Sequence, residues 1–276
     1  KCQYCDFYSL STKEDKLLDG YLDATCRHIR EAGALAPGYK VDTIYFGGGT
    51  PSLLGGKRLS ALIEAVRERF LLTADAEITL EANPADDLYG TLAAFAAAGG
   101  NRLSLGMQSG RAQELRLLGR RHSPDDVTRT LADARAVGLS NISLDLMLGI
   151  AAQDDATALS SVAAAVDYGV PHVSAYMLKI EEGTPYAAAP PADLADADAL
   201  ADRYLAVCEA LEAAGLLQYE ISNFAKPSFR SRHNSRYWNL SQYAGFGPKI
   251  QKLYETLTGI QMGTVPAPEG WICEIL

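Results

Sequence analysis

The chain has 276 residues, of which 48% are hydrophobic, so it is long enough for one large α/β domain with or without a small appendage. Its net charge of −9 argues against a nucleic-acid partner, because phosphate binding requires clustered lysine and arginine side chains. No apolar run approaches the roughly 20 residues that a membrane span needs. The five cysteines are too few and scattered for a disulfide framework, which predicts a reducing, cytoplasmic location.

Strand and helix patterns alternate along the chain. The first predicted strand, residues 41–46, stops at three consecutive glycines, and residues 57–70 follow with the apolar spacing of a helix. Ser123 precedes Pro124 as the predicted N-cap of a later helix. The remaining predicted strands are residues 77–81, 102–106, 141–145 and 172–176, and the remaining helices are residues 88–98, 124–137 and 156–168. This alternation predicts βαβ units and a parallel sheet, as a barrel or as a doubly wound sheet.

A proline-bearing linker at Pro190 and Pro191 precedes a longer predicted helix, residues 194–214. We therefore expect a sheet domain over residues 1–189 and a helical and loop extension over residues 190–247. Residues 248–276 carry no readable periodic pattern, and we expect an atypical tail of unknown structure there.

Polar and glycine residues stand at the ends of four predicted strands. Gly48, with Gly49 and Thr50 after it, follows the first strand, and Glu81, Gln108 and Asp145 lie at or just beyond the next three. Ligands bind at the carboxyl edge of a parallel sheet, so these residues predict a pocket for a polar molecule with an amine and a ribose. The alternative is that glycines simply end strands and that the two carboxylates are helix caps or surface groups.

The pair Cys2 and Cys5 is the second chemical signal. Two cysteines three residues apart can place both thiolates on one metal ion or cluster. From the spacing alone, a zinc site, a redox pair and an iron–sulfur cluster all remain open.

The order of several motifs resembles the HemW-type branch of the radical S-adenosylmethionine (SAM) superfamily, whose relatives include oxygen-independent coproporphyrinogen III oxidases. The resemblance runs to about residue 247, through the segments CQYCDFYS, YFGGGTPS, EANP, RLSLGMQS, LGR, DLMLG, EGTPY, YEISNF and HNSRYW. The resemblance implies an incomplete (β/α)6 radical SAM barrel of parallel strands, with its first strand missing and the start of a C-terminal extension.

The resemblance also implies a role for each matching residue. Cys2 and Cys5 would ligate a 4Fe–4S cluster, and Tyr4 would lie beside the adenine of SAM. The glycine loop of Gly48, Gly49 and Thr50 would receive the methionine amino group. The remaining matches are Glu81 and Arg120 near the methionine moiety and Gln108 and Asp145 at the ribose. We expect these groups to converge on one pocket near Cys5.

Two features favour the HemW-like branch. Phe7 occupies a position where coproporphyrinogen dehydrogenases carry a further cysteine. His233 begins the segment HNSRYW, which matches the haem-linked motif of the branch, and imidazole is a common haem ligand. Tyr237 and Trp238 would flank the macrocycle and nearby arginines would pair with its propionates. The alternative is a histidine that is hydrogen-bonded within the protein.

The leading hypothesis is therefore a haem chaperone that binds haem, SAM and a cluster, delivers haem to acceptor proteins and uses an electron donor. A dimer and peripheral membrane contact are compatible with it. The alternatives are a coproporphyrinogen III dehydrogenase and a zinc or structural module built on Cys2 and Cys5. The family's first cluster cysteine would stand four residues before Cys2, so we expect the chain as given to be inactive in SAM cleavage. The sequence after Pro248 also departs from the family pattern.

Two further histidines carry no ligand signal. His28 lies on a charged helical face beside arginines and is expected to be solvated. His172 opens a predicted strand and is expected to be a structural residue with hydrogen-bond partners.

Overall fold

A computed structural model describes residues 2–7, 14–84, 87–241, 243–247 and 272–275. The chain divides into two compact units. Unit 1 comprises residues 1–7, 82–88 and 103–230, and unit 2 comprises residues 8–81, 89–102 and 231–276. Both units combine strands with helices, as the alternating sequence pattern predicts.

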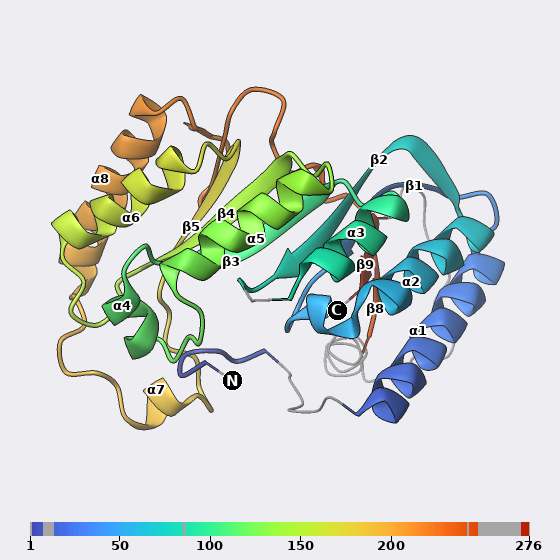
Figure 1. The fold of residues 1–276 in the computed structure, drawn as a ribbon, viewed down its shortest axis with the longest axis horizontal. Coiled ribbons are helices and arrows are strands. Elements are labelled where there is room, and N and C mark those ends of the chain that lie inside the picture. Colours follow the sequence, from blue (N-terminus) through green and yellow to red (C-terminus); the bar gives the residue numbers. More distant parts are fainter. Residues whose placement is uncertain (1, 8–13, 85–86, 242, 248–271, 276) are drawn as a thin grey trace. The chain divides into compact units, whose positions relative to one another are not determined.

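Unit 2 contains the first two strands and the first helices (Figure 1). Its strand order is β2-β1-β9-β8, and the pairs β1–β2, β1–β9 and β8–β9 are parallel. Helices α1, α2 and α3 contact one another in sequence order. The elements are α1 (Asp15–Leu35), β1 (Lys40–Phe46), the 3-10 helix η1 (Pro51–Leu54), α2 (Gly56–Arg69), β2 (Leu71–Ala82), α3 (Tyr89–Ala97), α9 (Arg232–Trp238), β8 (Tyr243–Phe246) and β9 (Ile272–Ile275).

Unit 1 contains the strands that follow, in the order β6-β7-β5-β4-β3. Strands β4 and β5 are parallel, with Asp145 opposite Ser174, whereas β7 runs antiparallel to β5 and β6. The elements are β3 (Arg102–Gln108), α4 (Ala112–Leu117), α5 (Pro124–Ala136), β4 (Asn141–Leu148), α6 (Asp155–Asp167), β5 (His172–Met177), α7 (Pro185–Ala188), α8 (Ala197–Ala213), β6 (Leu217–Gln218) and β7 (Asn223–Ala225).

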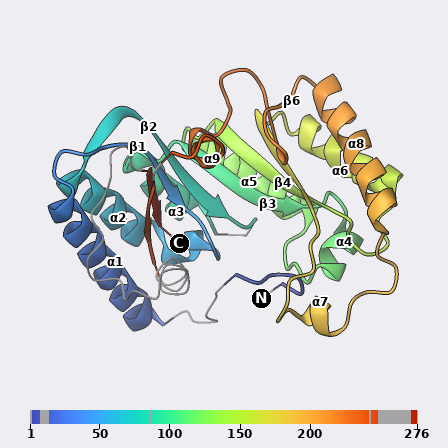
Figure 2. The ribbon, with the colours of Figure 1, turned by 180° about the vertical axis from the view of Figure 1, so that it is seen from behind.

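Each long strand has one apolar and one polar face, because successive side chains point to opposite sides of a sheet. The apolar residues pack with the helices: in unit 2, the rings of Phe46 on β1 and Phe95 on α3 meet edge to face, 6.3 Å apart. In unit 1, α5 and α6 cover the same side of the strands, as the front and rear views agree (Figures 1 and 2). The opposite face carries polar side chains, and the candidate site residues lie on or at the end of it.

The expected elements are present, with shifted ends. Strand β2 begins at Leu71 instead of residue 77, and β3 and β4 extend to Gln108 and Leu148. The extra residues of β2 pair with β1, since Lys40 lies opposite Leu71 and Val41 opposite Leu72. The local sequence pattern does not predict this pairing, because the pairing depends on contact with a neighbouring strand. The domain division proposed from the sequence stays a prediction, and most of its expected tail lies outside the described residues.

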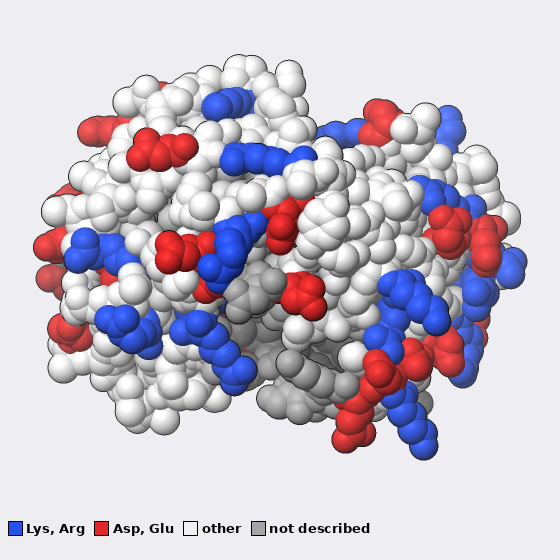
Figure 3. Space-filling view, in the orientation of Figure 1, with Lys and Arg blue, Asp and Glu red and all other residues white. Residues whose placement is uncertain are grey.

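Surface charge agrees with the composition. In Figure 3, Lys and Arg side chains are interspersed with Asp and Glu on the face shown, and they form no continuous basic area there. Among the described helices, none is long and apolar enough to cross a membrane.

The N-cap of α5 gives a stability prediction. Ser123 accepts a hydrogen bond from the Asp126 amide at 3.3 Å, and the Asp126 carboxylate accepts one from the Ser123 amide at 2.6 Å, which together form a capping box. Ser123→Ala should lower the free energy of unfolding by about 1 kcal/mol, because one helix amide loses its partner. Denaturant unfolding would measure this change in the free energy of unfolding. Ser140→Ala, at an exposed position, is the control. Equal stability of the two variants would contradict this role.

Candidate functional site

A short turn in unit 1 holds the two amino-terminal cysteines. The Cys5 amide donates to the Cys2 carbonyl at 3.3 Å. Of the two residues between them, Gln3 donates its backbone amide to the Leu118 carbonyl at 3.4 Å and accepts at its carbonyl from the Tyr186 amide at 3.1 Å. Both thiols are free and partly exposed. Within the described residues no group of three or more His, Cys, Asp or Glu could hold a metal ion, and this turn supplies two thiols.

Tyr4 and Arg120 form a clamp beside this turn. The Tyr4 ring packs against Leu118, Met147 and Ile150. The guanidinium of Arg120 donates from Nη2 to the Tyr4 hydroxyl and from Nη1 to Asn83 Oδ1, each at 2.5 Å. Burial raises the pKa of the Tyr4 hydroxyl, and the charge of Arg120 opposes that shift. Arg120 Nε is buried and has no hydrogen-bond partner among the described residues, which fits a ligand carboxylate.

Gly106 on β3 lies at the centre of the same group. A Cβ at this position would lie 2.9 Å from Asn83 Oδ1 and 3.0 Å from Gln108 Nε2, with Arg120 Nη1 at 3.6 Å. Tyr4, Gln108 and Arg120, all expected from the sequence, are thus brought together in unit 1. A glycine here leaves room that any side chain would fill.

Gln108 has a left-handed backbone, with φ of 64°. A residue with a Cβ pays about 1 kcal/mol or more for this conformation, and such strain is characteristic of functional positions. The turn places the Gln108 side chain beside Gly106.

Asp145 lies on β4, within unit 1. Ser104 on β3 donates its hydroxyl to Asp145 Oδ1 at 3.1 Å and lies 3.4 Å from Oδ2. Ser104 stands two residues before Gly106 on the same strand face. Because Asp145 lies inside a strand, the alternative that it is a helix cap is excluded.

Unit 2 holds the remaining strand-end residues. Glu81 on β2 accepts from the Tyr45 hydroxyl at 2.7 Å and from the Gly48 amide at 3.2 Å. Gly48 has φ of 100°, a conformation that glycine adopts freely. Gly49 and Thr50 continue this loop into η1. Glu81 is not a helix cap either, because it lies on β2 and accepts a hydrogen bond from the glycine loop.

The structure thus assembles two groups of the expected residues, one in each unit. Cys2, Cys5, Tyr4, Gln108, Arg120 and Asp145 belong to unit 1, and Gly48, Gly49, Thr50, Glu81 and His233 belong to unit 2. The single pocket expected near Cys5 for the cluster and SAM residues stays a prediction, and His233, expected at the haem, is not part of it.

His233 on α9 is enclosed in unit 2, with 1% of its surface exposed. Its Nδ1 lies 3.0 Å from the Thr43 hydroxyl and its Nε2 lies 3.1 Å from the Tyr237 hydroxyl. The ring stacks on Tyr45, with centroids 4.7 Å apart, and the His233 amide donates to Glu77 at 2.9 Å. Burial lowers the pKa of the imidazole to about 3, helped by the positive charges of Arg102 and Arg236. The ring is therefore neutral at physiological pH.

The surface beside His233 is aromatic. Four large hydrophobic side chains are exposed within seven residues: Tyr237 (38%), Trp238 (56%), Leu240 (89%) and Tyr243 (43%). The rings of Tyr237 and Tyr243 contact each other edge to face at 5.2 Å.

The arginines of this segment already have acidic neighbours. Arg236 pairs with Asp42, and Arg232 lies 3.6 Å from Asp42 and 3.3 Å from Asp75. These ion pairs would have to open for the arginines to meet propionates.

Sequence reasoning missed several residues on the polar strand faces or just beyond them. Asn83 receives Arg120, Ser104 holds Asp145, and Tyr45 holds Glu81. Arg102 is 1% exposed on β3, and its Nε and Nη1 have no hydrogen-bond partner among the described residues. These residues could have been found from the polar residues at every second position of the strands. A search limited to strand ends does not use this signal.

The expectation for His28 was wrong. Its imidazole is half-buried and packs edge to face on Phe246 at 5.0 Å, and burial lowers its pKa. The helix pattern could not reveal this, because Phe246 lies far along the chain. His172 is structural as expected: its ring nitrogens lie 2.7 Å from the Ser143 hydroxyl and 2.8 Å from the Tyr219 hydroxyl.

Comparison with known proteins agrees with this arrangement. The radical SAM superfamily matches residues 1–178 of the chain. The chain belongs to the radical SAM superfamily. It is 41% identical over 247 residues to the heme chaperone HemW of Escherichia coli (strain K12). The aligned region covers 90% of this chain and 65% of that protein. HemW of Mycobacterium tuberculosis (strain H37Rv) is 42% identical over 258 residues, with the same two coverages. The chain thus spans somewhat less than two thirds of these relatives.

Two further relatives extend the comparison. The mitochondrial radical S-adenosyl methionine domain-containing protein 1 of Mus musculus is 41% identical over 258 residues, or 57% of its length. The solved structure of the Escherichia coli coproporphyrinogen III oxidase HemN matches with a TM-score of 0.78 at 23% identity, covering 99% of this chain and 59% of that one. This likeness shows the fold: an incomplete radical SAM barrel of the α/β class.

The buried His233 gives a pH prediction. In the unfolded chain a histidine binds a proton below about pH 6.5, whereas folded His233 does so only near pH 3. Stability is therefore lost as the pH falls below about 6.5, by roughly 2 kcal/mol between that pH and about 4.5. His233→Gln should show a smaller loss. Denaturant unfolding of both proteins across this range measures the difference, and parallel pH curves would contradict a neutral buried imidazole.

Proposed function

We propose that this chain is the core of a haem carrier that binds SAM and a 4Fe–4S cluster and delivers haem to acceptor proteins. The observation that carries the haem assignment is a group of exposed hydrophobic side chains, Tyr237, Trp238, Leu240 and Tyr243, of which Tyr237 contacts the neutral His233. The likeness to HemW chaperones over 90% of the chain supports it. We place this carrier in the cytoplasm, served by an electron donor, and compatible with a dimer.

The residues of unit 1 fit the cofactors that the superfamily implies. Cys2 and Cys5 would ligate the cluster as partly exposed thiolates on a fixed turn. Arg120 has a buried Nε for a carboxylate, and the space at Gly106 admits a close ligand. We assign Gln108 and Asp145 to the ribose and Tyr4 to the adenine. When bound, the cluster would supply the electron for reductive cleavage of SAM.

In unit 2, taken by itself, the glycine loop is suited to receive an amino group. The glycine loop at Gly48, Gly49 and Thr50 exposes backbone groups for the amino group, and Glu81 holds that loop in place through the Gly48 amide. Because this carboxylate also accepts from Tyr45, the loop conformation is set within the unit.

We propose that haem iron is taken by His233 Nε2. Thr43 holds Nδ1, so Nε2 is the nitrogen that a ligand would use, and the Tyr237 hydroxyl competes for it at 3.1 Å. Tyr237 is partly exposed and can turn outward, which would open the imidazole to the aromatic surface. A neutral imidazole needs no deprotonation before it binds a metal.

Haem titration followed by absorbance tests this assignment. His233→Ala should weaken haem binding about tenfold or more, because the nitrogen that would hold the iron is lost. Tyr237→Phe should strengthen it by about fivefold, because the competing hydroxyl is removed while the ring remains. His28→Ala, at a half-buried histidine of the same unit, is the control. Unchanged binding in the first two variants, or no saturable binding, would reject the haem assignment and favour the decarboxylase reading.

The SAM assignment has its own test. Gly106→Ala would place a methyl group against Asn83 Oδ1 and Gln108 Nε2, so it should weaken binding of S-adenosylhomocysteine at least about tenfold. This probe carries the adenine, ribose and amino-acid groups of SAM. Gly20→Ala, whose new Cβ would meet nothing within 4 Å, is the matched control. Calorimetric titration measures both, and equal affinities would reject a ligand at Gly106.

A further inference from the structure

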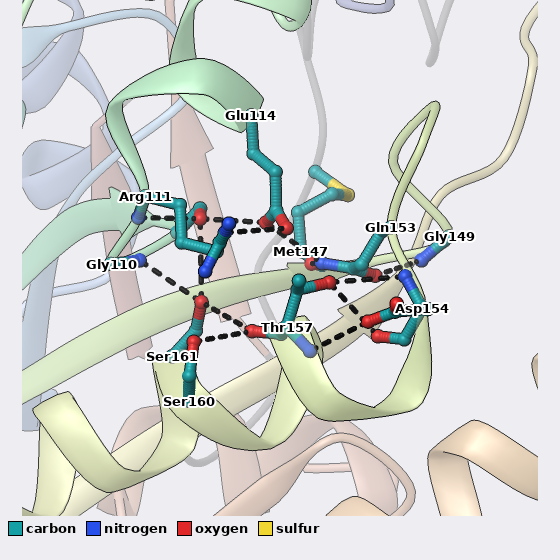
Figure 4. A network of polar contacts seen from close by, with 11 residues as sticks. Gly110, Arg111, Glu114, Met147, Gly149, Gln153, Asp154, Thr157, Ser160 and Ser161 are labelled. Carbon is teal, nitrogen blue, oxygen red and sulfur yellow. Dashed lines mark hydrogen bonds and ion pairs between the residues drawn. The ribbon is translucent and has the colours of Figure 1, made fainter.

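The turn after Gln108 is fixed by a buried polar network that none of the assigned contacts explains (Figure 4). The Ser109 amide donates to the Met107 carbonyl at 2.8 Å, which closes the turn around the left-handed Gln108. The Ser109 hydroxyl donates to Glu114 Oε2 at 2.7 Å and accepts from the Arg111 amide at 2.9 Å. Ser161 on α6 adds a hydroxyl 3.3 Å from that of Ser109.

Gln153 connects this turn to the end of β4. Its Nε2 donates to Glu114 Oε2 at 3.1 Å and to the Met147 carbonyl at 3.2 Å, and its Oε1 accepts from the Gly149 amide at 2.8 Å. In Figure 4 the side chains of Glu114 and Gln153 point toward each other from α4 and from the loop after β4. Met147 stands two residues after Asp145 on the same strand face. The network therefore joins the strand that carries Asp145 to the turn that carries Gln108.

The chemistry of the network suits a fixed geometry. Ser109, Glu114 and Gln153 are all buried, so water does not compete for their hydrogen bonds. A buried carboxylate needs donors, and Glu114 Oε2 receives two of them, one from each side of the connection. A left-handed glutamine persists only where its surroundings determine it, and these are the contacts that do so.

We propose that Gln153, through Glu114 and Ser109, is a positioning residue that holds Gln108 at its distance from Asp145 for a ribose. This inference rests on the proposed SAM site. The alternative is a network that only satisfies buried polar groups. That alternative lowers stability when the network is broken but leaves the affinity of a folded variant unchanged.

A double-mutant cycle separates the two readings, with S-adenosylhomocysteine as the probe in calorimetric titrations of folded protein. Gln153→Met keeps the length of the side chain but removes its hydrogen bonds, and it should raise the dissociation constant about tenfold. Gln108→Ala should do the same. In the Gln108→Ala background, Gln153→Met should add less than about twofold, because the side chain that it positions is already gone.

If Gln153→Met folds poorly, further variants test the same network at other residues. Ser109→Ala cuts the network at its other end and should raise the dissociation constant about fivefold, whereas Glu114→Gln retains an acceptor for both donors and should remain within about twofold. Thr157→Val is the matched control: it breaks the neighbouring capping box with Asp154, also drawn in Figure 4, and should lower the melting temperature without changing affinity.

The outcomes are distinguishable. If Gln108→Ala weakens binding but Gln153→Met and Ser109→Ala do not, the positioning role is overturned and the ribose assignment stands. An equal penalty from Gln153→Met in both backgrounds also overturns it. If Gln108→Ala leaves the affinity unchanged, the proposed SAM site fails and the positioning role fails with it.

Discussion

The alternation of apolar and polar residues along each strand is the constraint on which the rest of the structure depends. On β2, β3 and β4, every second residue is apolar and packs beneath helices, which leaves the other face to residues such as Glu81, Gln108 and Asp145. Burial of the apolar face drives folding, whereas the polar face contributes little hydrophobic stabilisation. A protein that keeps such a face must satisfy its polar groups with one another or with a ligand.

The polar faces follow this requirement in two ways. Most groups are satisfied internally, as Ser104 with Asp145 and Tyr45 with Glu81. Some buried polar atoms on or near these faces have no partner among the described residues, including Arg120 Nε, two nitrogens of Arg102 and Thr79 Oγ1. Arg120 lies beside the strained Gln108 and the space at Gly106, where binding energy from a ligand can offset the cost. The SAM site that we propose thus rests on groups that the fold leaves unsatisfied.

His233 shows the same principle in unit 2. Helix α9 lays a neutral imidazole on the polar residues Thr43 and Tyr45 of β1, and its outer residues expose aromatic rings. Burial of the imidazole keeps the ring uncharged, and the exposed side chains of the segment provide an apolar surface. One short helix therefore combines a neutral imidazole with exposed aromatic rings, which is why we propose the haem-carrier function for this segment.

The sequence by itself determined the α/β class and the strands and helices that periodicity predicts, with local motifs such as the capping box at Ser123. It placed Asp145 at a strand end, whereas the residue lies inside β4. It did not determine that Asn83 receives Arg120, that His28 packs on Phe246, or that Gln153 fixes the turn after Gln108. Each of these contacts joins residues separated along the chain, and which side chains meet is decided only when strands pair and helices pack. The tertiary structure alone also decided that His233 is buried and neutral, since its low pKa arises from desolvation and from nearby arginines.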